Sequence, residues 1–523
     1  MAKKEGGAVK TVGMMMTITV LGKLLGLWRD RLLSVHYGTG MAASAFLTAS
    51  RIPRVFFDAI FASAIAASFI PVYNEYLVRK DRVEADRFAG NFITVIGLLS
   101  LGLTALGILF APYLTVFFAD GYDAQTAALC TKLTRIMFPT VLFTGVAYSF
   151  VGIVQSMDEF NLPAAISLVS NGIIIAYYFT LNERFGVFGL AVAFLIAWLA
   201  QAAVQAPYLL RHGFRYTPSL SFMSEGMRKV FKLMMPVMVS TWVLPINQTI
   251  SAKFGSRLFG GAGVSAVEFA NNLYLIIAGV FVLSVTNYIF PRLSRMSSGS
   301  DSSAMCETIG GTLHTSLYII LPMMAGMMLL ARQMVTFIYG GGAFGDHSID
   351  ITSRALFYVA MGMVGYTVQS VLCRVYFAEQ NGRVPLVAGI ISIAVNIVLC
   401  ALLVKRFDVA GLGVASAAAS TVNAVLLAVP LRKRGMRFLT PAFLKDMLRI
   451  AVCVFVMTAA VYLTAGFTDG LMPGKAGELA AFALPTAAGA VVYAVITALL
   501  RIPETVTAIG FFKKKFGKGE GRA

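Results

Sequence analysis

Apolar residues dominate this chain in long runs, which short polar connections interrupt at fairly regular intervals. The runs are rich in Leu, Ala, Met and Phe and do not show the period-two alternation of a half-buried strand. A helix needs about 20 apolar residues to cross roughly 30 Å of hydrocarbon, and the chain supplies such windows nearly end to end. We therefore expect an all-α polytopic membrane protein rather than a β-barrel.

The breaks between the apolar runs predict about fourteen transmembrane helices. The expected bounds are 9–36, 43–77, 88–119, 124–157, 161–182, 186–210, 227–257, 263–292, 305–339, 350–378, 384–405, 410–431, 443–467 and 477–500. Pro53 and Pro71 fall in the second run, Pro139 in the fourth, and Pro236 and Pro245 in the seventh. Proline removes a backbone donor and clashes with the preceding turn, so these helices should kink or break.

Basic residues give the expected orientation. The 523 residues carry a net charge of +18, and Lys and Arg cluster in alternate short connections, as in Arg79, Lys80 and Arg82. Such clusters mark the cytoplasmic side of a membrane protein, so both termini should be cytoplasmic, which agrees with an even number of helices. The same clustering argues against nucleic acid as a partner. The first run should be retained as a helix and not cleaved as a signal peptide, because Lys23 and Arg29 interrupt it.

The second half of the chain repeats the first at an offset of 222 residues. The stretch 185–190 corresponds to 407–412, 161–163 to 383–385, and Gly213 to Gly435. Six helices per repeat predict two lobes related by an axis along the membrane normal, with two further helices at the C-terminal end. The expected domains are an N-terminal lobe 1–210, a cytoplasmic linker 211–226, a C-terminal lobe 227–432, helices thirteen and fourteen in 433–500, and a basic cytoplasmic tail 501–523.

Six charged residues in the first two helices are the main candidates for a binding site: Lys23, Arg29, Asp30, Arg51, Arg54 and Asp58. An ion near the bilayer centre costs roughly 2.5 to 3.5 kcal/mol on insertion scales and usually faces a partner or a watery cavity. Arg51, Arg54 and Asp58 share one face of the second helix, and Lys23 and Asp30 share one face of the first. Arg29 lies off that face, so it either pairs with Asp30 or reaches a different wall of the cavity. Four basic against two acidic residues leave a surplus of two positive charges, which suits an anionic ligand such as a pyrophosphate.

The second lobe offers polar candidates rather than a basic cluster. Asn247, Gln248, Glu268, Asn271 and Asn272 lie in the seventh and eighth helices. These residues either line the same cavity or make ordinary interhelical hydrogen bonds, and the sequence does not separate the two.

Catalytic and metal-binding patterns are missing from the sequence. The five cysteines have no CxxC pair, the four histidines are scattered, and no glycine-rich segment has the spacing of a nucleotide-binding loop. We expect no catalytic residue, no metal site and no cofactor. If the charged residues of the first two helices serve to move an anionic ligand across the membrane, that movement would depend on the membrane potential or on an ion gradient.

Several motifs resemble the MurJ (MviN) lipid II flippases of the MOP exporter superfamily. They are Gly26-Leu27-Trp28-Arg29-Asp30, the stretch 68–75, and Tyr339-Gly340-Gly341-Gly342-Ala343-Phe344. The resemblance covers nearly the whole chain. It implies a multi-pass protein of the bacterial cytoplasmic membrane that moves undecaprenyl-pyrophosphate-linked peptidoglycan precursor outward by alternating access, with helices thirteen and fourteen forming a groove for the lipid tail. It implies lipid II and membrane lipids as ligands, and cell-wall synthesis proteins as a further class of partner.

The site residues carry over unevenly. Arg29, Asp30 and Arg51 match the family pattern, and Lys23 stands where an arginine is usual. Three family positions differ, becoming Ser44, Phe57 and Asn272 here, and the acidic residues that bind sodium in some members correspond to Ser251 and Cys400. The alternatives are an exporter of another lipid-linked glycan, a cation-coupled multidrug exporter, and a non-transporting cell-wall scaffold. A drug exporter should have twelve helices and an acidic cavity, which this sequence does not predict.

Overall fold

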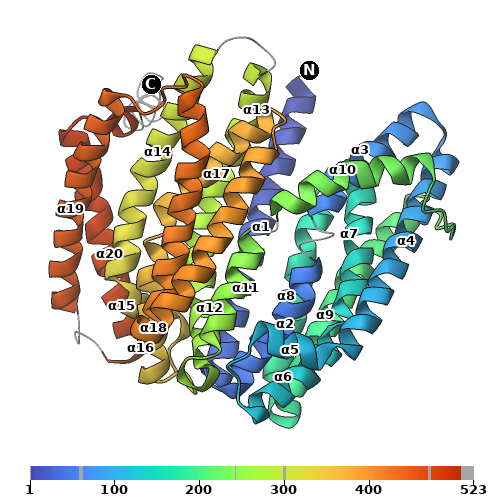
Figure 1. The fold of residues 1–523 in the computed structure, drawn as a ribbon, viewed down its shortest axis with the longest axis horizontal. Coiled ribbons are helices and arrows are strands. Elements are labelled where there is room, and N and C mark those ends of the chain that lie inside the picture. The colour runs from blue at the N-terminus through green and yellow to red at the C-terminus, as the bar shows by residue number, and fades with distance from the viewer. Residues whose placement is uncertain (1, 58–62, 242, 298–301, 469–472, 508–523) are drawn as a thin grey trace, which may run out of the picture. The chain divides into compact units, whose positions relative to one another are not determined.

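The computed structural model describes residues 2–57, 63–241, 243–297, 302–468 and 473–507. It divides into two compact units, a first unit of Met1–Glu268 with Gly342–Phe344 and a second unit of Phe269–Gly341 with Gly345–Ala523. Within the described residues every regular element is a helix and no β-strand occurs (Figure 1). The all-α prediction is confirmed.

The first unit contains eleven helices and the beginning of a twelfth. Their bounds are α1 Ala2–Tyr37, α2 Met41–Phe57, α3 Ser63–Arg79, α4 Arg82–Leu109, α5 Ala111–Phe118, α6 Ala124–Met137, α7 Thr140–Ser156, α8 Asn161–Thr180, α9 Asn182–Arg211, α10 Glu225–Thr241, α11 Val243–Gly255 and α12 Ala262–Tyr274. Four stacked aromatic rings lie in its core. The centroid of the Phe69 ring is 5.4 Å from that of Tyr73, 5.7 Å from that of Phe88 and 4.5 Å from that of Phe92. These rings fix α3 against α4.

The second unit contains the rest of α12 and eight further helices. They are α13 Val280–Ser297, α14 Ser302–Leu329, α15 Ala331–Tyr339, α16 Asp346–Ala360, α17 Met363–Ala378, α18 Arg383–Lys433, α19 Pro441–Thr468 and α20 Gly474–Leu499. In Figure 1, α19 and α20 run side by side and pack against α14. A small core of Leu330, Cys453, Met457, Val461 and Tyr493 joins these three helices.

The predicted runs match the observed helices closely, but several runs are broken. Pro139 lies between α6 and α7, as proline in the fourth run predicted. The single helix α18 covers two predicted helices and contains a non-helical residue at Asp408. By length and hydropathy, nine helical spans of the described residues are suitable for crossing a membrane, or ten if α16 and α17, bent by 45°, form one span. The predicted count of fourteen transmembrane helices is therefore not confirmed. The prediction of a multi-pass protein is confirmed.

The backbone supports the predicted repeat. Left-handed φ angles occur in four pairs of residues, each separated by 222 positions: Gly38 and Gly260, Asp158 and Gln380, Gly186 and Asp408, and Gly213 and Gly435. A positive φ is uncommon outside glycine, so four coincidences at one offset indicate the same chain path in both halves. The compact units divide inside α12, between Glu268 and Phe269. This division does not test the predicted lobe boundaries at 210 and 227, which stay a prediction.

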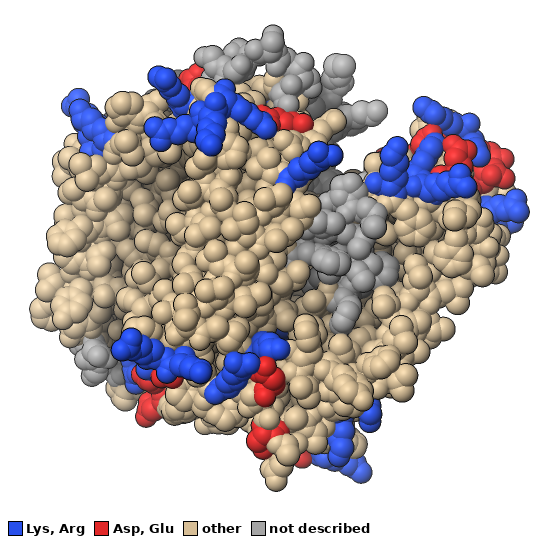
Figure 2. Space-filling model, viewed as in Figure 1, with Lys and Arg blue, Asp and Glu red and all other residues tan. Residues whose placement is uncertain are grey.

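Charged side chains gather at the ends of the helices. On the face drawn in Figure 2, Lys and Arg lie near the helix ends of each unit and a broad band between them carries few charges. This distribution is the one expected of helices that cross a hydrocarbon layer.

Candidate functional site

Arg29 on α1 is held by groups from two helices. Its guanidinium donates to Asp30 Oδ1 at 3.0 and 2.7 Å and to Asn171 Oδ1 on α8 at 3.2 Å. Asn171 also donates to the Gly22 carbonyl at 3.2 Å, where α1 and α8 approach so closely that a Cβ on Gly22 would lie 2.5 Å from Ser167 Oγ. Arg29 therefore pairs with Asp30 and also reaches another helix, α8, through Asn171. The Arg29 side chain keeps about a third of its surface exposed.

Arg51 and Arg54 on α2 converge on one carboxylate. Arg51 is buried, forms an ion pair with Glu268 and donates to the Gln248 carbonyl at 2.9 Å. Arg54 Nη2 lies 3.5 Å from the other oxygen of Glu268, and its side chain remains 44% exposed. Thus the first unit brings two predicted cations together with Gln248 and Glu268, which had been assigned to the second lobe. Asp58 lies outside the described residues.

The position of Glu268 changes the charge of the candidate site. Counted by sequence, the addition of Glu268 to the four basic and two acidic candidates lowers the surplus of the set from two positive charges to one. Arg51 is largely neutralised by its buried partner, whereas Arg54 and Arg29 are the more accessible cations. Lys23 on α1 is exposed.

The remaining polar candidates are divided between the units. Asn247 lies on α11 in the first unit, and Asn271 and Asn272 lie on α12 in the second, where both are partly buried. Since each unit is described by itself, Asn271 and Asn272 are not placed with the charged residues, and a shared cavity stays a prediction.

Ser44 is the position where the family resemblance leads one to expect an acid. Its hydroxyl is buried, lies 2.9 Å from Ser265 Oγ and donates to the Thr39 carbonyl at 3.3 Å. A carboxylate here would have to be buried beside a carbonyl oxygen and a hydroxyl, at considerable desolvation cost. The serine is therefore suited to a neutral interhelical contact.

An apolar groove lies between α14, α15, α19 and α20 in the second unit. Its volume is about 510 Å³, and its lining is almost entirely aliphatic, aromatic or methionine side chains. Met323, Met327, Met457, Val461 and Phe482 are typical of the lining. Such a surface holds an apolar chain by burial alone and provides little to orient a polar group. The helices involved include the two that the resemblance assigns to the lipid tail.

Two features of these sites escaped the sequence interpretation. Asn171 orients Arg29, and an isolated amide within an apolar helix was a signal that could have suggested it. The pairing of Glu268 with Arg51 was not foreseen, because residues 217 positions apart in different predicted lobes give no local pattern.

The MurJ family, described as "Lipid II flippase MurJ", matches residues 33–476. The chain is 25% identical over 488 residues to "Probable lipid II flippase MurJ" of Treponema pallidum (strain Nichols), covering 90% of this chain and 91% of the relative. It is 27% identical over 457 residues to the protein of the same name from Vibrio cholerae serotype O1 (strain ATCC 39315 / El Tor Inaba N16961), covering 85% and 86%.

Solved structures show the same fold. The structure titled "Lipid II flippase MurJ, inward closed conformation" has a TM-score of 0.77 at 24% identity and covers 93% of this chain and 98% of that one. A multidrug resistance MATE family transporter of the MOP superfamily has a TM-score of 0.64 at 15% identity and covers 82% and 99%. Because the family match extends from within α1 to the start of α20, this chain belongs to the MurJ family.

Proposed function

We propose that this protein is a transporter that moves lipid II, the undecaprenyl-pyrophosphate-linked peptidoglycan precursor, from the cytoplasmic to the outer leaflet of the membrane. The match to the MurJ family over residues 33–476 is the observation that carries this proposal. The helical fold and the absence of a catalytic motif from the sequence agree with a transporter rather than an enzyme. The relatives named "Probable lipid II flippase MurJ" align with most of this chain.

The basic residues of the first unit are proposed to bind the pyrophosphate. Arg29 and Arg54 combine partial exposure with a fixed anchor, in Asn171 and Glu268 respectively. A guanidinium is planar and carries five N–H donors, so it can pair with phosphate oxygens in a geometry that a flexible lysine cannot reproduce. Lys23 and Arg51 add positive charge, and Asp30 and Glu268 offset part of it.

The apolar groove is proposed to hold the lipid tail. Its lining runs along α14 from Tyr318 to Leu330 just beyond the helix end, which is twelve residue steps or roughly 18 Å at 1.5 Å per step. A stretch of polyprenyl chain of that length can be buried against methionine and valine without desolvating any polar group.

The orientation and the energy source also belong to this proposal. Both termini are placed in the cytoplasm, on the basis of the basic connections. Translocation of an anion outward is driven by a membrane potential that is negative inside or by an ion gradient, and no cofactor is involved. Cell-wall synthesis proteins are a further class of partner.

Transport in proteoliposomes tests the pyrophosphate site. Purified protein is reconstituted with labelled lipid II, and translocation is measured with and without an imposed potential. Arg54→Ala removes a charge-assisted contact worth about 1.5–3 kcal/mol, so the rate should fall roughly tenfold or more. Arg79→Ala is the matched control, because Arg79 is an exposed arginine that is ion-paired to Glu75 on its own helix.

The outcomes separate the alternatives. Translocation by the wild type that Arg54→Ala abolishes and Arg79→Ala leaves intact supports the proposal. A wild-type protein that is folded in liposomes yet moves no lipid II, or transport that is equal in both variants, would contradict it. If the protein is a non-transporting cell-wall scaffold, the folded wild type should move no lipid II.

A further inference from the structure

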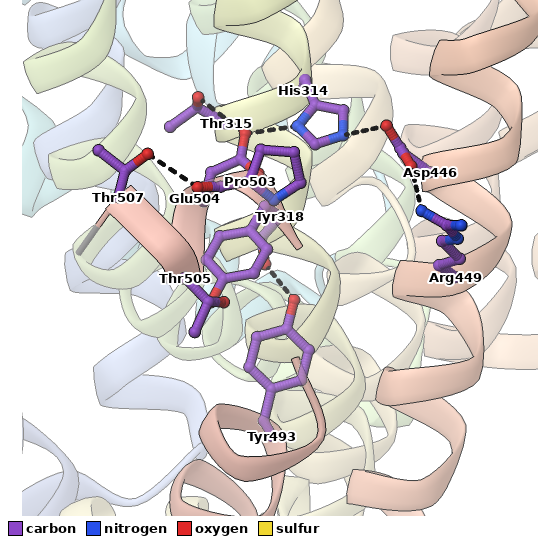
Figure 3. Close-up of polar contacts among 10 residues, drawn as sticks. All are labelled: His314, Thr315, Tyr318, Asp446, Arg449, Tyr493, Pro503, Glu504, Thr505 and Thr507. Carbon is purple, nitrogen blue, oxygen red and sulfur yellow. Dashed lines mark hydrogen bonds and ion pairs between the residues drawn. The ribbon is translucent and has the colours of Figure 1, made fainter. Parts of the chain in front are cut away.

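His314 on α14 lies between two carboxylates from different elements (Figure 3). Its Nδ1 contacts Glu504, which belongs to the helical turn 503–507 beyond α20, and its Nε2 is 3.8 Å from Asp446 Oδ2 on α19. The neighbouring Thr315 hydroxyl donates to the same Glu504 oxygen at 3.2 Å. One imidazole therefore joins three elements of the second unit.

The arrangement favours the doubly protonated imidazole. A neutral histidine has one N–H donor, so one of its nitrogens would turn a lone pair toward a carboxylate here. The side chains of His314 and Glu504 are only 12% and 15% exposed, and Glu504 Oε2 is buried with no hydrogen-bond partner among the described residues. Burial raises the pKa of Glu504, but the hydrogen bonds from His314, Thr315 and the backbone, together with the charge of His314, leave that pKa below its ordinary value. Each charge thus stabilises the other.

The other groups around His314 make the balance of charge explicit. A polar pocket of about 530 Å³ adjoins it, lined on α14 by Glu307 and, before α19, by Arg437. Arg449 on α19 lies 3.2 Å from Asp446. The acids around His314 are Glu307, Asp446 and Glu504. The charges of Arg437 and Arg449 balance two of these three carboxylates, which leaves one carboxylate with His314 as its counter-ion.

This cluster stands at one end of the apolar groove. Tyr318 and Tyr493 line the groove, and the Tyr493 hydroxyl donates to the Tyr318 carbonyl at 2.6 Å. The Tyr318 hydroxyl is 2.8 Å from Thr505 Oγ1, and Thr505 follows Glu504 in the chain. The segment that His314 holds therefore lines the polar pocket and also contacts Tyr318, a residue that lines the groove (Figure 3).

We propose that His314 is a proton-dependent lock, which fastens residues 503–507 and α19 to α14 and closes the polar end of the groove. With both nitrogens protonated, the imidazole attracts both carboxylates and the lock is shut. As the pH rises and one proton leaves, a nitrogen lone pair faces a carboxylate and the contact becomes repulsive. The segment then loosens, Thr505 moves away from Tyr318, and the groove opens toward the polar pocket.

Hydrogen exchange tests the lock without any measurement of transport, so its failure and that of the proposed function are distinguishable. The readout is the protection factor of amides in 502–507, where Ile502 donates to the Thr497 carbonyl at 2.9 Å and Val506 to the Ile502 carbonyl at 3.1 Å. The full chain is measured in nanodiscs. Protection in the wild type should fall about fivefold or more between about pH 6 and about pH 8.5. The protection factor is the intrinsic exchange rate divided by the observed rate at the same pH. It therefore does not include the ordinary acceleration of exchange by base.

Variants attribute the effect to the imidazole. His314→Gln should show low protection at both pH values, and His212→Gln, which changes an exposed histidine at the end of α9, should follow the wild type. Glu504→Gln keeps the shape of the side chain and removes its charge, so it should weaken the pH dependence even if His314→Gln folds poorly. Protection in the wild type that does not change with pH, or wild-type behaviour in Glu504→Gln, would overturn the proposal.

Discussion

At the scale of single residues, partners decide what each intramembrane charge can do. Arg51 is buried against Glu268 and serves to join α2 to the start of α12, whereas Arg54 shares that carboxylate and stays exposed. Two arginines three positions apart thus have different roles, although the sequence presents them as equivalent. The distinction comes from one acid far along the chain.

The pair of Arg51 and Glu268 yields a prediction on stability. Glu268→Ala leaves a buried guanidinium without its counter-ion, which costs about 3–5 kcal/mol. The double variant Arg51→Met and Glu268→Leu removes both charges and should recover most of that loss. Thermal unfolding in detergent measures both. If the double variant is no more stable than Glu268→Ala, the ion pair is not the source of the cost.

Asp408 gives a second prediction at this scale. Its φ of 50° and ψ of −132° are unfavourable for a residue with a Cβ, and the corresponding residue in the first half, Gly186, has nearly the same angles. Asp408→Gly should therefore stabilise the protein, by about 1 kcal/mol, and raise the melting temperature. Asp408→Ala is the control for loss of the charge. An equal rise in both variants would show that the backbone angle is not responsible.

At the scale of elements, short polar connections tie helices together where apolar packing ends. Asp120, in the connection between α5 and α6, accepts two hydrogen bonds from Arg257 at 2.8 and 2.7 Å and lies 3.4 Å from Lys253 Nζ on α11. A Cβ on the adjacent Gly121 would lie 2.5 Å from the Arg257 backbone, so only glycine permits this approach. The connection is held to the end of α11 by charge and by close backbone contact.

This contact predicts a pH dependence. The hydrogen bonds from Arg257 hold the pKa of Asp120 below its ordinary value of 3.8, although partial burial opposes them. A carboxylate with a lowered pKa stabilises the fold above its unfolded pKa and loses that contribution as the pH falls through its folded value. Asp120→Asn should thus lower stability at pH 7 by about 0.5 kcal/mol, the scale of exposed ion pairs. The difference from the wild type should vanish once the pH falls below the folded pKa of Asp120. A difference that persists in acid would contradict this origin.

At the scale of the whole molecule, the sequence predicted the class of fold, the runs of helix and the internal repeat, because each depends on local hydropathy or on glycine and proline. The pairing of charges was harder to predict. Arg29 has its partner in the next residue and was anticipated, whereas Arg51 finds Glu268 only through packing of distant helices. The groove was implied by family resemblance, but its polar end, with His314 and Glu504, comes from three separate segments and left no pattern in the sequence.

The groove yields a prediction on transport. Gly326 lines it, and a Cβ there meets no atom within 4 Å. Gly326→Leu should fill the groove without a clash, preserve or slightly raise helix stability, and lower lipid II translocation roughly tenfold. Gly102→Leu on α4 is the matched control, because that position is equally open and lies outside the groove. Equal translocation by the two variants would exclude the groove from the transport path.

The four pairs of left-handed residues at a spacing of 222 have a historical consequence. They are the trace expected if a gene for one half was copied and the two copies were fused in tandem. In two of the pairs both residues are glycine, while Gly186 corresponds to Asp408 and Asp158 to Gln380. The backbone turns of the two halves therefore coincide even where the residue types at those turns differ.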